Sequence, residues 1–216
     1  MKTETTVIAY DIHDVTEYIN WLYFFHSWGF QPRFATIAQI HGCDACRASW
    51  LASFPKEDIS KAAEAMQLHK EAQRMLNALD GDFKVYAMYR LMDAYADGDD
   101  LLLDGVRFPL LRQQTHVRED DPYLCLSDFV RPLEQGIADT VGAFAATIDE
   151  EMEKPFEDDD YKRMLIKTLG ERLAEAAVEK MHQHIRKHVW GYAPDENLSM
   201  QQLLNEEFQG IRPAIG

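Results

Sequence analysis

Three side chains that can act as acid, base or ligand share one face of a predicted helix: Glu175, Glu179 and His182. Spacings of four and three residues place side chains on the same helical face. Glu179 and His182 form a Glu-x-x-His unit, which di-iron helical bundles use twice, whereas this chain has one copy. We interpret the group as a polar face that meets a ligand or a loop, with metal binding as the less favoured alternative.

A second group comes from the segment "IHGCDAC", which sets His41, Cys43 and Cys46 close together. Cys-x2-Cys with a nearby histidine can begin a zinc site, but a structural zinc ion takes four ligands and the sequence has no second pair. A redox pair is the other alternative. We favour two reduced thiols in an ordinary loop and therefore expect no metal. The sequence also has no phosphate-binding glycine loop and no nucleophile beside a base, so we predict no catalytic residue.

Composition narrows the class of protein. The chain has 216 residues, 46% of them hydrophobic, which is enough to bury a core. Its net charge of −15 repels phosphate groups and argues against nucleic acids and anionic membranes as partners. No apolar run approaches the roughly 18 residues of a membrane span, and the first residues do not resemble a secretion signal. We expect a cytoplasmic protein.

The elements that position these side chains follow from periodicity and capping signals. The first helix is predicted over 14–29, with Asp14 as its cap, and the second over 60–81. Short helices or irregular chain are expected over 32–55. Strands are predicted over 83–92, 100–111, 123–130 and 139–147, with a turn over 93–100. Because loops rather than long helices separate these strands, the sheet should be mixed or antiparallel.

The longest predicted helix covers about 160–189. Its apolar stripe repeats every four residues, and the acidic run from Glu150 to Asp160 is interpreted as a solvated loop leading into it. Gly170 inside this helix indicates a close packing point or a bend. Ser199 should cap a short helix that ends at Gly210. The expected fold class is α+β, in a single domain over 1–216.

Four blocks near the C-terminus carry a specific resemblance. They are Arg-Leu-Ala-Glu-Ala at Arg172 to Ala176, Trp-Gly-Tyr-Ala-Pro at Trp190 to Pro194, Glu-Asn-Leu-Ser at Glu196 to Ser199, and Gly-Ile-Arg-Pro-Ala at Gly210 to Ala214. In this order they resemble the activation domain of cobalamin-dependent methionine synthase. Weaker matches extend the resemblance back to about Tyr18, with 34–58 as an insertion.

The resemblance implies a bent, mostly antiparallel sheet with surrounding helices. It also implies a module that binds S-adenosylmethionine, caps the corrin and assists reductive methylation of cob(II)alamin. The cobalamin would be bound by a partner module, and a flavodoxin-like donor would supply the electron. By resemblance, Arg212 meets the ligand carboxylate, Glu175 meets the ammonium, and the backbones of Ala214 and Gly216 approach the ligand. Asn20 stands where the family has a carboxylate.

The sequence departs from the family at its end. The family continues beyond the position of Gly216 with a tyrosine and a further segment, so we expect a C-terminally shortened, stand-alone component rather than a complete methyltransferase. The alternative is a module that docks on a corrinoid protein and has lost S-adenosylmethionine binding. A third hypothesis is a metal-binding helical protein using Glu179, His182 and the Cys43 pair. Because an acidic donor would be repelled, Arg186 and Lys187 are candidates for a local basic docking patch.

Overall fold

The chain divides into two compact units in a computed structural model that describes residues 2–115 and 121–212. The helical unit consists of Ile8–Ala87 and Ala146–Phe208. The strand unit consists of Met1–Val7, Met88–Ala145 and Gln209–Gly216. The expectation of one domain over residues 1–216 stays a prediction.

Five strands form one sheet, and the α+β class with an antiparallel sheet is confirmed. The strands are β1 (Thr6–Asp11), β2 (Lys84–Asp97), β3 (Asp100–Leu103), β4 (Val106–Phe108) and β5 (Asp139–Ile148). The order is β1-β2-β3-β4, and β5 also pairs with β2. Ala94 lies opposite Leu103 in the antiparallel β2–β3 pair, and Leu101 lies opposite Phe108 in the β3–β4 pair.

Residues 93–100 were expected to be a turn, but β2 continues through most of them to Asp97. Burial alternates along this part of the strand, with Ala94 and Ala96 buried and their neighbours less so. Ala94, Leu101 and Leu103 form the core of the strand unit and explain why pairing persists. The predicted turn is confined to Gly98 and Asp99, at the end of its range. A second turn at Asp104-Gly105, with φ angles of 49° and 84°, divides the single strand predicted over 100–111 into β3 and β4. Two adjacent residues of positive φ suit a tight hairpin.

The predicted strand over 123–130 is wrong, because this segment contains a 3₁₀ helix, η3 (Leu126–Phe129). The Asp128 carboxylate accepts the Cys125 N–H at 2.8 Å and holds the turn. The same carboxylate receives two hydrogen bonds of 2.7 Å from Arg112. This distant arginine makes the turn more stable than an extended strand, and local propensity could not reveal it. A further 3₁₀ helix, η4 (Leu133–Gln135), precedes β5.

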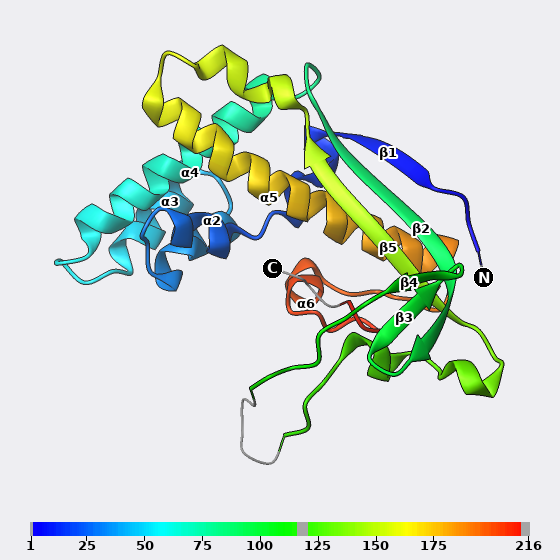
Figure 1. Cartoon of the computed structure of the whole chain (residues 1–216). Helices are drawn as coiled ribbons and strands as arrows, with labels where there is room; N and C mark the ends of the chain where they lie inside the picture. Colours follow the sequence, from blue (N-terminus) through cyan, green and yellow to red (C-terminus); the bar gives the residue numbers. More distant parts are fainter. Residues whose placement is uncertain (1, 116–120, 213–216) are drawn as a thin grey trace. The chain divides into compact units, whose positions relative to one another are not determined.

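The helical unit is built around α5 (Asp160–His184), with α2 (Trp21–Ser27) and α4 (Ile59–Leu79) beside it (Figure 1). Burial along α5 confirms the apolar stripe: Leu165, Leu169, Leu173, Ala177 and Met181 are all buried. Its last predicted turn is a π-helical segment, η6 (Ile185–Val189). Shorter elements complete the unit: α1 (Ile12–Val15), η1 (Thr16–Tyr18), η2 (Pro32–Gln39), α3 (Asp44–Ala52), η5 (Glu150–Phe156) and α6 (Met200–Leu204).

Gly170 is a close packing point in α5. A Cβ atom built there would lie 2.5 Å from Cδ1 of Ile148, which is closer than two carbon atoms can approach. The absence of a side chain therefore lets the helix meet the end of β5. The acidic run before α5 is mostly exposed, as expected, but Glu150–Phe156 form the 3₁₀ helix η5 rather than a loop. Asp159 caps α5 by accepting the Lys162 N–H at 3.0 Å.

Two helix boundaries differ from the predictions. The helix expected over 14–29 is interrupted, because Ile19 and Asn20 have extended backbones with ψ angles of 122° and 90°. The cap of the first part is Asp11 rather than Asp14, whose carboxylate instead accepts the Asp11 N–H at 3.1 Å. Ser199 caps α6 as predicted, but that helix ends at Leu204, well before Gly210. Glu206 takes the left-handed conformation (φ 58°), and Glu207 N–H closes the end on the Gln202 carbonyl at 3.0 Å.

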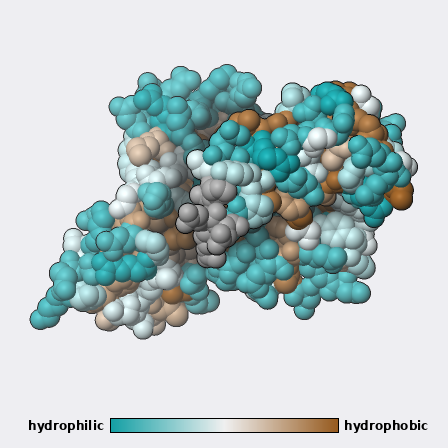
Figure 2. Space-filling view, turned by 60° about the horizontal axis from the view of Figure 1, so that its bottom comes forward, coloured by the Kyte–Doolittle hydropathy of each residue, from teal (hydrophilic) through white to brown (hydrophobic). Residues whose placement is uncertain are grey.

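Hydrophilic residues cover most of the face drawn in Figure 2, in keeping with the net charge of −15. Apolar residues appear there as separate patches. Among the residues that the structure describes, no helix combines the length and apolar character that crossing a membrane requires.

Candidate functional site

Asn20 lies at the break between η1 and α2 and is the N-cap of α2. Its side-chain Oδ1 accepts the Leu22 N–H at 3.2 Å. Asparagine is among the best N-cap residues because its short side chain reaches the free N–H groups of the first turn. The cap both explains the interruption of the predicted helix and uses one of the two lone pairs on this oxygen.

The segment from Tyr18 to Tyr23 runs along α5 and brings Asn20 to this helix. The Tyr18 hydroxyl donates to Oε1 of Gln183 at 2.7 Å, and the Arg172 guanidinium lies 5.9 Å from the centre of the Tyr23 ring. Burial, followed by the nearby Glu17 carboxylate, raises the pKa of Tyr18 above its usual value. Asn20 is therefore held between two contacts with α5, and Glu175 lies on the stretch of α5 between them.

Glu175 presents a carboxylate that is available to solvent. Its side chain is 57% exposed, and one oxygen accepts from Arg172 Nη1 at 2.9 Å. The Arg172 side chain is 12% exposed. Its Nε is buried and has no hydrogen-bond partner among the described residues. A carboxylate and an unsatisfied donor thus stand next to each other on one face of α5, which is an environment for a polar group or water.

Arg212 is the last residue that the structure describes, and its side chain is half-buried. It belongs to the strand unit, whereas Glu175 and Asn20 belong to the helical unit. Ala214 and Gly216 lie outside the described residues. Of the five predicted ligand contacts, the structure therefore places two, Asn20 and Glu175, on neighbouring elements of one unit.

Arg186 does not form the basic docking patch that the sequence suggested, because it is 0% exposed. Its Nε and Nη2 donate to the two carboxylate oxygens of Glu196 at 2.8 and 2.5 Å. Its Nη1 lies 2.7 Å from His182 Nδ1, and the guanidinium lies 4.3 Å from the centre of the Phe208 ring. Lys187 is likewise engaged, since its Nζ donates to the Glu196 carbonyl at 2.8 Å.

The buried Arg186–Glu196 pair fixes the loop that contains the Trp-Gly-Tyr-Ala-Pro and Glu-Asn-Leu-Ser blocks to the end of the long helix. Arg186 on the π-helical turn holds Glu196 on the returning loop, and the Ala193 N–H donates to the Arg186 carbonyl at 3.1 Å. Trp190 and Tyr192 pack edge to face, with ring centres 5.2 Å apart. The sequence analysis did not predict this pair. The available signal was the position of Arg186, ten residues before Glu196 of the Glu-Asn-Leu-Ser block.

Two groups of metal-ligating side chains converge among the described residues, and neither contains Glu179 or His182. One group is Asp11, His13 and Asp14, in which Lys84 pairs with Asp11 and the Asp80 carboxylate lies 2.9 Å from His13 Nδ1.

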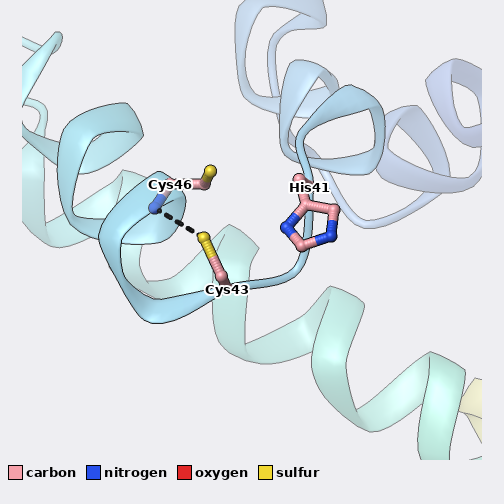
Figure 3. A group of neighbouring side chains, drawn as sticks. All are labelled: His41, Cys43 and Cys46. Atoms are coloured by element: carbon pink, nitrogen blue, oxygen red, sulfur yellow. Dashed lines mark hydrogen bonds between the residues drawn. The ribbon is translucent and has the colours of Figure 1, made fainter.

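The other group is His41, Cys43 and Cys46, whose cysteines are unbridged (Figure 3). Cys43 is the N-cap of α3, and its Sγ accepts the Cys46 N–H at 3.3 Å. Hydrogen bonding to His41, and then to Cys46, lowers the pKa of Cys43 to about 6, whereas hydrogen bonding to Cys43 raises the pKa of Cys46.

Comparisons with known proteins agree with the fold and the motifs. The family model described as "Vitamin B12 dependent methionine synthase, activation domain" matches residues 11–216. A crystal structure of the MetH reactivation domain bound to AdoHcy is 32% identical to this chain and superposes with a TM-score of 0.80. The match covers 99% of this chain and 64% of the other, so the chain spans less than two thirds of that protein's length. The chain belongs to the activation domain family of vitamin B12-dependent methionine synthase.

Proposed function

We propose that this chain binds S-adenosylmethionine and assists the reductive methylation of cob(II)alamin held by a partner module. The observation that carries the proposal is the similarity of nearly the whole chain to a reactivation domain bound to AdoHcy. AdoHcy is what remains of S-adenosylmethionine once its methyl group has been transferred. The corrinoid would supply the cobalt that accepts the methyl group, and an external donor, flavodoxin-like by the family resemblance, would supply the electron.

The residue chemistry suits a zwitterionic ligand. The Arg212 guanidinium can bind a carboxylate through two parallel hydrogen bonds. The exposed Glu175 carboxylate can accept from an ammonium group, and Arg172 beside it limits its motion by the 2.9 Å ion pair. We propose further that the backbones of Ala214 and Gly216 approach the ligand, as the family resemblance implies. The part of this chain is to bind and position the methyl donor, which lowers the entropic barrier to transfer.

A corrinoid-binding partner is part of the proposal. The edge strand β4 is exposed along its length, with Val106 and Phe108 59% and 45% exposed, and Leu111, which follows the strand, is 81% exposed. Exposed apolar side chains that follow one another along an edge suit contact with another protein. The electron donor must dock elsewhere than on Arg186, because that side chain is inaccessible.

Calorimetric titration with S-adenosylmethionine tests the proposal. A charge-assisted hydrogen-bonded pair contributes about 1.5–3 kcal/mol, so Arg212→Ala should weaken binding about tenfold to a hundredfold. Arg212→Lys should restore only part of the affinity, because an ammonium group cannot make the bidentate contact. The melting temperature verifies that both variants remain folded. A parent protein that releases no heat at millimolar ligand, with or without a corrinoid protein, contradicts the proposal.

The second candidate function is a docking module that no longer binds S-adenosylmethionine. The specific observation in its favour is Asn20, which offers no negative charge and already uses Oδ1 in capping α2. Titration with the corrinoid partner distinguishes the two functions. A pure docking module would bind that partner equally well with and without S-adenosylmethionine.

A further inference from the structure

His41, Cys43 and Cys46 form a cluster that the proposed function does not use. His41 lies in the link between η2 and α3, Cys43 caps α3, and Cys46 lies in its first turn. One ligand atom from each of the three side chains lies within 4.8 Å of the others. Figure 3 shows the three side chains near one another, and its dashed line marks the hydrogen bond from the Cys46 N–H to the Cys43 sulfur. The histidine, two residues before the first cysteine, is thus brought to the thiol pair by the fold.

Two thiols and an imidazole are the ligands that zinc prefers in proteins. In a tetrahedral zinc site, Zn–S bonds of about 2.3 Å and Zn–N bonds of about 2.0 Å place ligand atoms about 3.5–3.8 Å apart. The side chains must therefore approach one another by at most about 1 Å, which rotation about χ angles can provide at an open surface. His41 is exposed and both cysteines are half-buried, so solvent and ions can reach the cluster.

The local backbone supports a negatively charged sulfur at this position. The Cys46 N–H donates to Cys43 Sγ at 3.3 Å, and the free N–H groups at the beginning of the nine-residue α3 favour negative charge. Hydrogen bonds to a ligating atom of this kind hold its orientation and tune its affinity. Asp44, the nearest carboxylate in sequence, is fully exposed and lies 3.5 Å from Arg47, and it is not part of the cluster.

The other converging group lacks these properties. Lys84 pairs with Asp11, and Asp80 binds both the backbone N–H and Nδ1 of His13 at 3.0 and 2.9 Å. An ammonium group and a hydrogen-bonded carboxylate already satisfy the atoms that would coordinate a cation. Only the sulfur-containing cluster therefore combines suitable ligands with available coordination positions among the described residues.

We propose that His41, Cys43 and Cys46 bind one Zn²⁺ ion, with the fourth position left to water or an external ligand. Both cysteines bind zinc as thiolates, and any proton still on a sulfur is released to solvent, so a divalent ion and two thiolates give a neutral site. Structural zinc sites usually have four protein ligands, whereas three protein ligands leave the fourth position open to water or another ligand. The ion would link the segment after η2 to the first turn of α3.

Cobalt(II) is the probe for this site because it adopts the same tetrahedral coordination and, unlike zinc, absorbs visible light. The reduced, metal-free protein is titrated with Co²⁺ and then with Zn²⁺. We expect one equivalent of Co²⁺ to bind with a thiolate-to-cobalt charge-transfer band and intense tetrahedral bands, and one equivalent of Zn²⁺ to abolish both. Zinc should also raise the melting temperature of the protein.

Variants then assign the ligands. Cys43→Ser or Cys46→Ser should weaken zinc binding at least about a hundredfold, since losing a ligand is worse than losing an outer partner, which costs 10–100-fold. His41→Gln should keep the charge-transfer band but weaken binding about tenfold or more. Cys125→Ser, at a buried cysteine, and His26→Gln, at an exposed histidine, are the matched controls and should bind like the parent.

Three results would overturn the proposal. The first is a reduced parent protein that shows no charge-transfer band at stoichiometric Co²⁺. The second is a band that survives both cysteine substitutions. The third is binding that saturates only at many equivalents, as for scattered surface carboxylates. The titrations use no S-adenosylmethionine, so their outcome does not depend on the proposed function.

Discussion

Arg186 and Glu196 show most clearly how one residue pair stabilises a motif. The carboxylate is 5% exposed and the guanidinium 0%, and two hydrogen bonds join them. Removing one partner of such a pair leaves an uncompensated buried charge, so Glu196→Gln or Arg186→Met should lower the free energy of unfolding by about 3–5 kcal/mol. Urea denaturation measures this loss.

The double variant Arg186→Met with Glu196→Leu provides the control for that prediction. Because it removes both charges, it should be more stable than either single variant. Arg163→Ala breaks an exposed pair with Asp160 and should change stability by less than about 0.5 kcal/mol. Single variants as stable as the Arg163 variant would show that the buried pair contributes little.

Asn20 combines a structural role with a proposed binding role. Aspartate caps helices as well as asparagine does, so Asn20→Asp should leave stability nearly unchanged. It adds the negative charge that the family resemblance implies at this position, and an exposed charge pair contributes about 0.2–1 kcal/mol. We therefore expect S-adenosylmethionine to bind up to about fivefold more tightly, measured by calorimetry.

The matched control for Asn20 is Asn77→Asp, which makes the same charge change at an exposed position of α4. If both variants change the affinity equally, the position of Asn20 has no special relation to the ligand. A tighter Asn20→Asp variant would instead link the loss of the family carboxylate to weaker binding in this chain.

For single residues, the sequence predicted which face of a helix a side chain occupies, but not whether that side chain is buried or which partners it has. Glu175 could be assigned to a helical face from spacing alone, and α5 confirms that face. The burial of Arg186 could not be predicted, since it depends on a glutamate beyond the end of the helix and on Phe208. A basic cluster at a helix C-terminus is usually solvated, and here long-range packing overrides that expectation.

In the helical unit, α2 and α4 pack through aromatic side chains. His69 of α4 belongs to this packing and makes the stability of the protein depend on pH. Its ring lies edge to face against Trp21 of α2, with ring centres 4.5 Å apart. Burial, and then the nearby Arg47 charge, lowers the pKa of His69 to about 4, whereas an unfolded histidine titrates near 6.5. Between these values the unfolded state binds the proton and the folded state does not, so stability is lost as pH falls.

We expect His69 to make the protein about 2 kcal/mol less stable at pH 5 than at pH 7. His69→Gln should abolish this part of the pH dependence in urea denaturation, even if the variant is less stable throughout. His26→Gln, at an exposed histidine of α2, should leave the dependence intact. Equal slopes for the parent and the His69 variant would contradict the assignment.

At the scale of elements, the long periodic helices were predictable and the short ones were not. The ranges of α4 and α5 follow from apolar spacing, because packing and propensity agree there. The 3₁₀ helix at 126–129 depends on Arg112, more than ten residues away, and the end of α6 depends on a glutamate with positive φ. A distant arginine leaves no signal in the local sequence. The end of α6 is equally hard to predict, because glycine rather than glutamate is the usual residue of positive φ at a helix end.

At the scale of the whole molecule, a net charge of −15 limits how partners can approach. Long-range repulsion disfavours an acidic electron donor, and this repulsion weakens as salt screens the charges. The buried state of Arg186 removes the basic patch that the sequence suggested. Recognition of a corrinoid partner by apolar side chains such as Val106 and Phe108 would not require opposite charge.

In the proposed function, one molecule binds both S-adenosylmethionine and a corrinoid partner. If the chain positions S-adenosylmethionine for a corrinoid partner, the ligand and the partner should each bind more tightly in the presence of the other. Thermodynamic linkage requires the two enhancement factors to be equal, and typical coupling corresponds to about 5–150-fold.

Calorimetry on each of the four binding steps measures both factors independently. Arg212→Ala should weaken the binding of S-adenosylmethionine, so a higher ligand concentration should be needed to tighten the binding of the partner. Its affinity for the partner in the absence of the ligand should stay unchanged. A partner affinity that does not respond to saturating S-adenosylmethionine would instead support the docking module, in which partner recognition is retained without a ligand to position.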